Sequence, residues 1–166
     1  TRGQWCAHGG VVHSYTGTRD DVERFLALGF SFSVNGVSFR TEHGIEAAAA
    51  IPADRFMLET DAPWCDIRST HPSWPLLCAA RERMRAQHEK SGADVSDLDL
   101  AAPAGAAGAA AATCRKDRFK PGCMVKGRNE PCTISDVLLV AAEARHEDPT
   151  VLAQHAYDNT MRMFFA

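Results

Sequence analysis

Closely spaced cysteine pairs are absent from this sequence. The chain has 6 cysteines in 166 residues, and no two of them form a C-x-x-C pair. The tight ligand spacing of most structural zinc sites is therefore missing, and the chain is longer than typical disulfide-stapled secreted domains. We expect reduced thiols in an intracellular protein of the cytoplasm, the nucleus or both. The cysteines are Cys6, Cys65, Cys78, Cys114, Cys123 and Cys132.

Long apolar runs and a strong excess of charge of one sign are also absent. No apolar run approaches the roughly 18 residues that a membrane-spanning helix needs. The N-terminus shows no basic region followed by an apolar one, which a signal peptide would have. The net charge is −3, so no strong global field attracts nucleic acid. We therefore expect no membrane partner, and any contact with DNA has to be local.

The composition is that of an ordinary globular domain. Apolar residues make up 45% and charged residues 23% of the chain, and 166 residues are enough for one domain with a real core. The chain starts at Thr1 rather than at a methionine and runs almost at once into a strand-like pattern. We expect it to be the C-terminal part of a longer protein.

Strand-like and helix-like patterns alternate in the first part of the chain. Thr18 is a good helix N-cap, and Val22, Phe25 and Leu26 recur at the spacing of one buried helical stripe. Alternation of this kind predicts parallel strands joined by right-handed helical crossovers, which is an α/β fold. The predicted strands are 9–17, 30–36 and 55–61, and the predicted helices are 18–29 and 41–50.

Loops and helices replace strands in the rest of the chain. A rim loop over 64–75 precedes a helix over 76–90. Residues 92–114 are rich in alanine and glycine and offer little that could be buried, so we predict a disordered insertion there. The expected organisation is one folded unit made of 1–91 and 115–166, interrupted by this insertion.

Two helices are predicted at the C-terminal end. Thr133 is expected to cap the first. Asp148, followed by Pro149 at the first helical position, is expected to cap the second, which runs to about Phe165. Apolar residues at helical spacing predict the packing faces. These are Ile134, Val137, Leu138, Ala141 and Ala144 in the first helix, and Met161, Phe164 and Phe165 in the second.

Residues 56–64, with the sequence FMLETDAPW, carry the strongest candidate site. Three apolar residues predict a strand buried on both faces. Polar residues follow at its C-terminal end, where βα-barrels place their chemistry. Pro63 lacks an N–H and ends the ladder, which would hold Asp61 rigidly at the rim. Alternatively, Asp61 is a capping residue before a turn. A single motif supports only a hypothesis, so both interpretations stay open.

His13 stands at the end of the first predicted strand. In a barrel its imidazole would share one pocket with the carboxylate of Asp61. Such a pair suits Zn²⁺ or Mn²⁺, or Mg²⁺ if more oxygen ligands are present. Two ligands do not fill any of these coordination shells. A histidine on an apolar strand is also often a core residue or a support for a ligand, and both interpretations stay open.

Neighbouring polar residues have more than one interpretation. Glu59 alternates with Asp61 along the strand and should face the same side. It is a metal ligand, a partner of Arg128 or, as we favour, a residue that supports a ligand. Asn129 and Glu130 shape the rim of the pocket, bond the backbone behind it, or form a structural turn.

Three residues of the predicted rim loop could meet a nucleic acid. Arg68 and His71 are candidates for contact with phosphate, or they are solvated loop residues. Trp64 could stack on a base, although packing beneath the rim is the role we favour.

Three motifs, in this order, resemble the TatD family of metal-dependent deoxyribonucleases. They are VVHSYTG at 11–17, LETDAPW at 58–64 and RNEP at 128–131. The eukaryotic branch is the nearest, because Cys65, the segment STH at 69–71 and the ending NTMRMFF at 159–165 also match its pattern. The resemblance covers the chain apart from the insertion.

The resemblance implies a partial TIM (β/α) barrel of the metallo-dependent hydrolase type, made of the last three βα units and the C-terminal helices. It implies one or two divalent ions, Mg²⁺, Zn²⁺ or Mn²⁺, and hydrolysis of DNA phosphodiester bonds, often as a 3′ exonuclease. By the matching motifs, His13 is a metal ligand, and Asp61 contacts metal and the attacking water. A metal lowers the pKa of bound water and offsets charge in the transition state, and a carboxylate can take the proton.

The early motifs of the family are missing. The sequence has no His-x-His on a first strand, no glutamate on a middle strand and no matching histidine before His13. A half barrel has open sheet edges. We therefore expect the chain alone to be poorly stable, to self-associate through those edges, or to be an inactive fragment of a complete enzyme. Two other functions stay open: a metallohydrolase of amides or esters on the same fold, and a non-catalytic truncated module.

Overall fold

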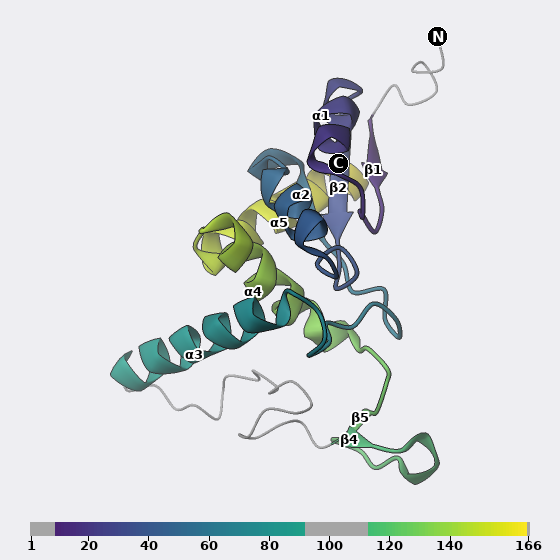
Figure 1. Cartoon of the computed structure of the whole chain (residues 1–166), viewed down its shortest axis with the longest axis vertical. Coiled ribbons are helices and arrows are strands. Elements are labelled where there is room, and N and C mark those ends of the chain that lie inside the picture. Colours follow the sequence, from purple (N-terminus) through teal and green to yellow (C-terminus); the bar gives the residue numbers. More distant parts are fainter. Residues whose placement is uncertain (1–8, 92–112, 166) are drawn as a thin grey trace.

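The computed structural model describes residues 9–91 and 113–165 of the chain (Figure 1). Its main sheet has three parallel strands in the order β1-β2-β3, and the crossovers between them contain helices α1 and α2. This confirms an α/β fold with the predicted alternation. The strands are shorter than predicted, although backbone hydrogen bonds from Tyr15 to Ser33 and from Glu59 to Val34 continue the ladder past their ends. The elements are β1 (Gly10–Val12), α1 (Arg19–Ala27), β2 (Phe30–Val34), α2 (Glu42–Ala50) and β3 (Phe56–Leu58).

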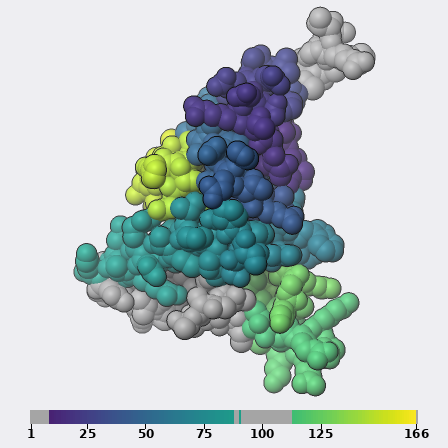
Figure 2. All heavy atoms as spheres, in the orientation of Figure 1, coloured from purple at the N-terminus to yellow at the C-terminus, as the bar shows by residue number. Residues whose placement is uncertain are grey.

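The second half is mostly helical. Helix α3 begins at Trp74, earlier than predicted, because a proline is tolerated in the first turn, where backbone N–H groups lack intrahelical partners. The short parallel strands β4 and β5 pair with each other, and the residues around them project from the lower end of the molecule (Figure 2, green). The remaining elements are α3 (Trp74–Ser91), β4 (Thr113–Cys114), β5 (Met124–Val125), α4 (Ile134–Arg145), α5 (Pro149–Phe164) and 3-10 turns at Ala53–Arg55, Lys116–Arg118 and Pro131–Thr133.

The predicted insertion over 92–114 lies almost wholly outside the described residues. Its last two residues, Thr113 and Cys114, form β4, and the bounds of the insertion stay a prediction. The closure of the sheet into a barrel, and the grouping of 1–91 with 115–166, stay predictions.

The described cysteines and helices bear on two expectations from composition. Cys65, Cys78, Cys114 and Cys123 form no disulfide within the described residues, and the reduced state stays a prediction. Within the described residues, none of the helices combines the length and the apolar character that crossing a bilayer requires.

The two faces of the main sheet differ in chemistry. Side chains alternate along a strand, so Phe32 and Phe56, which are in register, both face the helices and are fully buried in the main core. Helix α1 packs against β2, and α5 packs against β3. On the opposite face Ser31 and Ser33 are buried, and Ser33 is in register with Met57. The apolar face carries the core, and the smaller, more polar face leads to the ends of the strands.

Helix α1 begins as predicted. Thr18 and Asp21 form a capping box, in which the Asp21 N–H donates to the Thr18 hydroxyl and the Thr18 N–H donates to the Asp21 carboxylate, each at 3.3 Å. Hydrogen bonds from the hydroxyl and the N–H of Thr18 hold the pKa of Asp21 below its ordinary value. Val22 is buried, and Phe25 and Leu26 pack against the core, which confirms the predicted stripe.

Arg145 of α4 ties three elements together. Its guanidinium donates to the carbonyl oxygens of Ala48, Ala49 and Ile51, where α2 ends. The same guanidinium lies 5.2 Å from the centroid of the Phe56 ring. A cation near a helix C-terminus compensates the partial negative charge there, and a cation over an aromatic face is attracted by the ring. Arg145 therefore fixes α2, α4 and β3 relative to one another.

The predicted cap of α4 is wrong, whereas that of α5 is confirmed. Thr133 stands at the N-cap position of α4 but makes no capping bond. Its hydroxyl lies 2.8 Å from the Glu130 carbonyl oxygen instead, because a 3-10 turn precedes the helix and takes Thr133 out of the extended conformation that a cap needs. At α5, the Asp148 carboxylate accepts from the N–H groups of Thr150 and Val151 at 2.8 and 3.3 Å.

The packing face of α4 is broader than the predicted stripe. Val137 and Ala141 are buried as predicted, but Ile134 is exposed. Helices α2, α3 and α5 all contact α4, so its buried surface extends around more than one side. The additional buried residues are Leu139, Val140 and Ala142.

The predicted packing residues of α5 are wrong. Asn159 is the buried residue near that end of the helix, and its Nδ2 donates to the carbonyl oxygens of Ala53 and Phe56 at 2.7 and 2.8 Å. Backbone carbonyls at the start of β3 need donors once they are buried, so a polar side chain faces them and the apolar ones turn outward. The exposed residues are Met161, Phe164 and Phe165.

Candidate metal centre

Three strand ends meet at one edge of the main sheet. His13 immediately follows β1, Asn35 follows β2 and Glu59 follows β3. A backbone hydrogen bond of 3.0 Å from the Glu59 N–H to the Val34 carbonyl continues the ladder past the assigned strands. Because the strands are parallel and aligned, side chains at these positions share one face. The fold therefore gathers a histidine, an amide and a carboxylate at one place.

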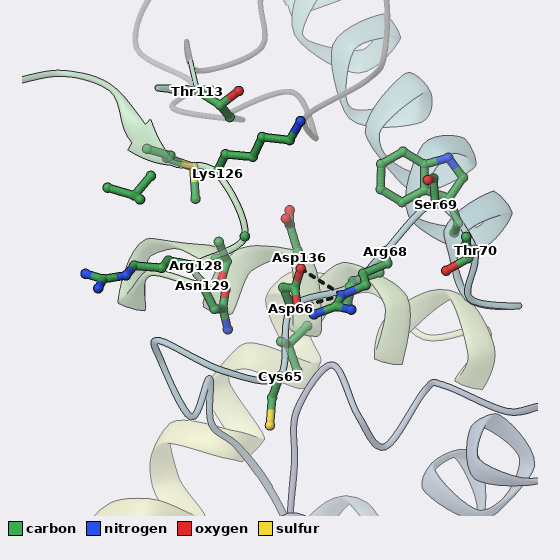
Figure 3. Close-up of a pocket in the computed structure, with 17 residues that line it drawn as sticks. Cys65, Asp66, Arg68, Ser69, Thr70, Thr113, Lys126, Arg128, Asn129 and Asp136 are labelled. Atoms are coloured by element: carbon green, nitrogen blue, oxygen red, sulfur yellow. Dashed lines mark hydrogen bonds and ion pairs between the residues drawn. The ribbon is translucent and has the colours of Figure 1, made fainter. Parts of the chain in front are cut away.

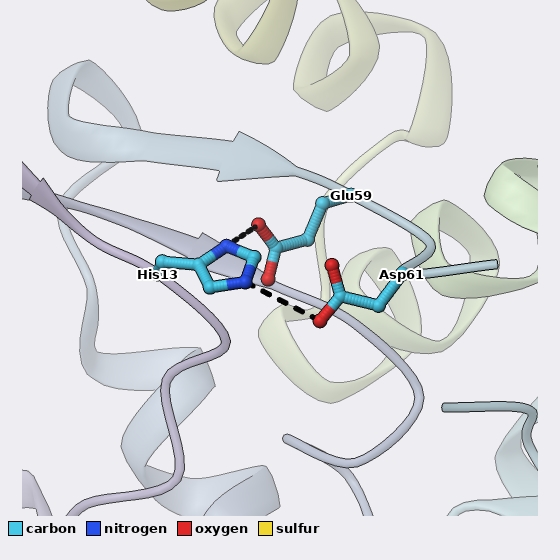
Figure 4. A group of neighbouring side chains, drawn as sticks. All are labelled: His13, Glu59 and Asp61. Atoms are coloured by element: carbon cyan, nitrogen blue, oxygen red, sulfur yellow. Dashed lines mark hydrogen bonds and ion pairs between the residues drawn. The ribbon is translucent and has the colours of Figure 1, made fainter. Parts of the chain in front are cut away.

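The imidazole of His13 lies between two carboxylates (Figure 4). Its Nδ1 is 2.6 Å from Oε2 of Glu59, and its Nε2 is 3.4 Å from Oδ2 of Asp61. Within the described residues, one potential ligand atom from each of these three side chains lies within 4.8 Å of the others. The structure thus brings together the two predicted ligands, His13 and Asp61, with Glu59 beside them.

Glu59 is held by four donors. Its Oε1 accepts from the Ser14 N–H at 2.7 Å and from Asn35 Nδ2 at 3.2 Å. Its Oε2 accepts from Ser33 Oγ at 2.6 Å and faces His13 Nδ1. Arg128 is not among these partners in the described part of the chain. In the tautomer with its hydrogen on Nδ1, the ring donates to Glu59 and leaves the lone pair of Nε2 on the side of Asp61, which is the tautomer that would bind a metal.

Tyr15 anchors the loop that carries His13. Its ring is buried and packs edge-on against Phe32, with centroids 5.0 Å apart. Its hydroxyl donates to the Thr18 carbonyl oxygen at 2.6 Å. Burial, and then the charge of Asp21, raise the pKa of Tyr15 to about 12. The phenol therefore stays a donor at neutral pH, and the loop is fixed at both its ring and its hydroxyl.

Asp61 reaches the site from a turn rather than from the strand. Strand β3 ends at Leu58, and Asp61 has a φ of 50°, in the left-handed region that aspartate tolerates better than most residues. Its carbonyl oxygen accepts from the Trp64 N–H at 2.8 Å, which closes the turn. The prediction that Glu59 and Asp61 alternate along one strand is therefore wrong, although both carboxylates face the same pocket.

Asn35 is a site residue that sequence reasoning missed. It is fully buried, and its Nδ2 lies 2.8 Å from Ser14 Oγ, 3.2 Å from Glu59 Oε1 and 3.0 Å from Asp61 Oδ2. The amide therefore sets the separation of the two carboxylates. The available signal was its position, because Asn35 follows the middle strand as His13 and Glu59 follow the outer two.

Gly36 allows the loop after β2 to pack closely against the loop after β3. A Cβ at this position would overlap the carbonyl oxygen of Cys65 and come within 2.9 Å of the carbonyl carbon of Asp66. A side chain here would have to displace backbone. The glycine thus lets the segment that follows Asp61 sit directly on the segment that follows Asn35.

The separation of the two candidate ligand atoms is the one expected on a divalent ion. Two ligands on a tetrahedral ion with bonds of about 2.0–2.1 Å are separated by about 3.4 Å, and His13 Nε2 and Asp61 Oδ2 are 3.4 Å apart. The side chains of His13, Asp61 and Glu59 are 64%, 28% and 16% exposed, so both candidate ligand residues are open to solvent and Glu59 is more enclosed. This is the arrangement of a ligating histidine oriented by a carboxylate behind it.

Cys65 lies next to the same carboxylate. Its Sγ is 3.9 Å from Asp61 Oδ2. Burial, followed by the negative charges of Asp61 and Glu59, raises the pKa of the Cys65 thiol. The sulfur therefore stays a neutral, protonated group that can donate weakly to Asp61.

The family model described as "TatD related DNase" matches residues 2–165. The chain belongs to this family. The match covers the segments that hold His13, Glu59 and Asp61, so the strand-end cluster is part of a TatD-family domain. It agrees with the resemblance that the three sequence motifs carry.

Curated TatD relatives are longer than this chain. It is 33% identical over 154 residues to a protein of Schizosaccharomyces pombe named "Deoxyribonuclease Tat-D", with 93% of this chain and 40% of that protein covered. It is 35% identical over 156 residues to the Saccharomyces cerevisiae protein of the same name, with 93% and 34% covered. The chain thus spans about two fifths or less of the length of these relatives.

A solved structure shares the TatD-family fold of this chain. It is described as an uncharacterized amidohydrolase from Saccharomyces cerevisiae, and it matches with a TM-score of 0.71 at 33% identity. The match covers 93% of this chain and 39% of that one. The α/β arrangement of the described residues is therefore that of an amidohydrolase-type fold.

Asn129 links the two TatD motifs, LETDAPW and RNEP. It is buried, its Nδ2 donates to the Thr60 carbonyl oxygen at 2.8 Å, and its N–H donates to the Pro63 carbonyl oxygen at 3.0 Å. It therefore bonds the backbone behind the pocket, which is one of the predicted alternatives. Glu130 lines a separate cavity of about 310 Å³.

The three rim-loop candidates are placed differently from one another. Trp64 is 73% exposed, so the favoured prediction that it packs beneath the rim is wrong. Arg68 donates to the Asp66 carboxylate at 3.0 Å. Nδ1 of His71 accepts from the Arg68 N–H at 3.3 Å. Burial, and then the charges of Arg40 and Arg68, lower the pKa of His71, which favours the neutral ring that this hydrogen bond needs.

Proposed function

We propose that this chain supplies the histidine and the aspartate of a divalent-metal centre that hydrolyses DNA phosphodiester bonds. The observation that carries the proposal is the convergence of His13 Nε2 and Asp61 Oδ2 at 3.4 Å, in a TatD-family domain. Glu59 supports the geometry by holding the other ring nitrogen. A mixed nitrogen and oxygen set of this kind suits Zn²⁺, Mn²⁺ or, with more oxygen ligands, Mg²⁺, as one or two ions.

The side chains would divide the chemistry among them. A bound divalent ion supplies an acidified water and a positive charge opposite the phosphate. His13 would hold the ion through Nε2, and Asp61 through Oδ2. Asn35 fixes that oxygen with a hydrogen bond of 3.0 Å. Oδ1 of Asp61 has no hydrogen-bond partner among the described residues, and it is the atom that would take the proton of the attacking water.

The proposal assigns the remaining ligands to polypeptide other than the described residues, because two protein ligands leave the coordination shell of these ions unfilled. On this account the three strands are part of a TIM barrel of the metallo-dependent hydrolase type, in the C-terminal portion of a longer intracellular protein. The chain alone would then be inactive. It would also tend to self-associate through β1 and β3, each of which has one neighbour in the described sheet.

Cleavage of end-labelled DNA tests the proposed activity. The longer protein that carries the remaining ligands, with Mg²⁺ or Mn²⁺, should shorten the labelled strand progressively from its 3′ end, and EDTA should stop the reaction. Asp61→Asn should remove the activity, whereas Asp20→Asn, an exposed carboxylate on α1, serves as the matched control. An Asp61→Asn protein as active as its parent would rule out the role of Asp61 in the nuclease. Cuts within the strand, rather than at its 3′ end, would rule out exonuclease action but not nuclease activity.

A second candidate function is hydrolysis of amides or esters. The specific observation in its favour is the match to the yeast structure described as an amidohydrolase. A panel of small amide, carboxylic ester and phosphodiester substrates separates the two candidates. Turnover confined to the phosphodiesters supports the nuclease, and metal-dependent turnover of the amides supports the alternative. Binding of DNA without turnover of any substrate supports the non-catalytic module.

A further inference from the structure

A cavity of about 450 Å³ opens beside the candidate metal centre. It lies between the rim loop at 65–70 and the segment at 124–129, and Figure 3 shows Lys126 and Arg128 on one side of it and Ser69 and Thr70 on the other. The volume is within the range of about 300–1,000 Å³ that is typical of sites for small organic groups. The cavity is large enough to hold part of an unpaired nucleic acid strand.

The cavity shares its wall with the metal centre. Cys65 lines it, and the sulfur of Cys65 is 3.9 Å from Asp61 Oδ2. Asn129 also lines it and holds the carbonyl oxygen of Thr60, the residue before Asp61, at 2.8 Å. Cys65 and Asn129 therefore each contact both the cavity and the segment that carries Asp61.

Of the charged side chains that line the cavity, two cations have no acidic partner within the described residues. Asp66 is paired with Arg68, and Asp136 is paired with Arg81. Lys126 and Arg128 also line the cavity and are exposed, and neither forms an ion pair within the described residues. Positive charges without acidic partners are what the phosphates of a nucleic acid bind.

Hydroxyl groups complete the donor set. Ser69 and Thr70 are exposed on the rim loop and line the cavity. Neither hydroxyl has a hydrogen-bond partner in the part of the chain that the structure describes. Serine and threonine hydroxyls are, after arginine and lysine, common donors to phosphate oxygens.

We propose that this cavity binds the phosphodiester backbone of single-stranded DNA next to the bond that is cut, with Lys126 and Arg128 contacting phosphates. The inference rests on the proposed function, since it is the metal centre that makes DNA the expected ligand. Trp64 lies in the turn between Asp61 and Cys65 with its indole 73% exposed, where an unpaired base could stack on it. A cationic groove with an exposed aromatic ring is the usual combination in proteins that bind single strands.

The salt dependence of DNA binding tests the two cations. Fluorescence anisotropy of labelled single-stranded DNA is measured in EDTA, so that no cleavage occurs, over a series of salt concentrations. Each phosphate contact on a single strand contributes about 0.7 to the slope of log K against log salt. Lys126→Ala with Arg128→Ala should therefore weaken binding and reduce that slope by about 1.4.

Matched variants decide whether the effect belongs to the cavity. Arg118→Ala with Lys120→Ala removes the same charge from exposed positions on the same segment that do not line the cavity, and it should keep the wild-type slope. Lys126→Arg with Arg128→Lys should keep the slope as well. An unchanged slope in the alanine variant, or an equal loss in the Arg118 and Lys120 variant, overturns the inference.

The contribution of Trp64 has a different signature. Trp64→Ala should weaken binding without changing the salt slope, because stacking releases no counterions, and Trp64→Phe should restore most of the affinity. Affinity that Trp64→Ala leaves unchanged would remove the stacking part of the inference.

The binding experiment is independent of the cleavage experiment. If DNA is cut but the Lys126 and Arg128 variant binds like the wild type, the cavity inference fails and the proposed function stands. If DNA is not cut but that variant loses affinity and slope, the proposed function fails and the cavity remains a DNA-binding site.

Discussion

On the face of the main sheet that packs against the helices, Phe32 and Phe56 are fully buried, whereas on the opposite face Ser33 donates a hydrogen bond of 2.6 Å to Glu59. The first face is built from aromatic and aliphatic side chains. The second ends in the cluster of His13, Glu59 and Asp61. One sheet thus separates the residues that hold the fold together from those that would hold a metal. A substitution on either face should disturb one property far more than the other.

The largest expected effect is on the apolar face. Phe56→Ala should lower the free energy of unfolding by about 3–5 kcal/mol, because it removes a buried ring and leaves a cavity under Arg145. Urea unfolding measures the change. Phe119→Ala makes the same substitution at an exposed ring and should cost less than about 0.5 kcal/mol. Equal losses for the two variants would break the comparison.

The next effect is on the polar face. Glu59→Gln should lower metal affinity by about 10–100-fold, because the carboxylate that orients the His13 ring is lost. Competition against a metal-sensitive dye measures it. The free energy of unfolding should change much less than in Phe56→Ala. A variant that keeps full metal affinity but unfolds easily would show that Glu59 belongs to the structural face instead.

Asn159 gives a second test of the difference between the two faces, because it is polar but its hydrogen bonds stabilise the core. Asn159→Ala should cost about 1–3 kcal/mol of stability, because it removes the donor from the carbonyl oxygens of Ala53 and Phe56, the second of which is buried. Metal affinity should stay at the wild-type value. Gln154→Ala, at an exposed position of the same helix, is the matched control for thermal unfolding. A drop in metal affinity in Asn159→Ala would contradict the separation of the two faces.

The smallest effect concerns the rim loop and pH. The pKa of His71 is lower in the folded protein than its ordinary value of 6.5, so the unfolded chain takes up the proton more readily. The stabilisation that comes from neutral His71 is fully present above the ordinary pKa of 6.5. It is lost as the pH falls from 6.5 towards the lower pKa of His71 in the folded protein. The melting temperature of His71→Gln should therefore fall less on acidification than that of the wild type. An identical pH profile for the two proteins would contradict the assignment.

Local rules predicted the order of elements and the strand ends, but not the finer placement of the site. Caps and periodicity depend on neighbours in sequence, so Thr18, Asp148 and the stripe of α1 were predictable. The strand-end rule for parallel sheets placed His13 and Asp61 at one edge.

Features that depend on tertiary contacts were not predictable in the same way. Asn35 looks like a turn residue until both carboxylates are in place around it. The left-handed turn at Asp61 brings its carboxylate to Asn35, which follows a different strand. The faces of α4 and α5 were mispredicted because several helices, and buried carbonyls at β3, decide which side is covered.

Calorimetric titration of the metal-free protein with Mn²⁺ tests the central claim most directly, namely that His13 and Asp61 converge on a divalent ion. The double variant His13→Ala with Asp61→Asn should bind one ion fewer per chain than the wild type, and Asp20→Asn should bind as the wild type does. The same stoichiometry and affinity in the double variant as in the wild type would contradict the claim.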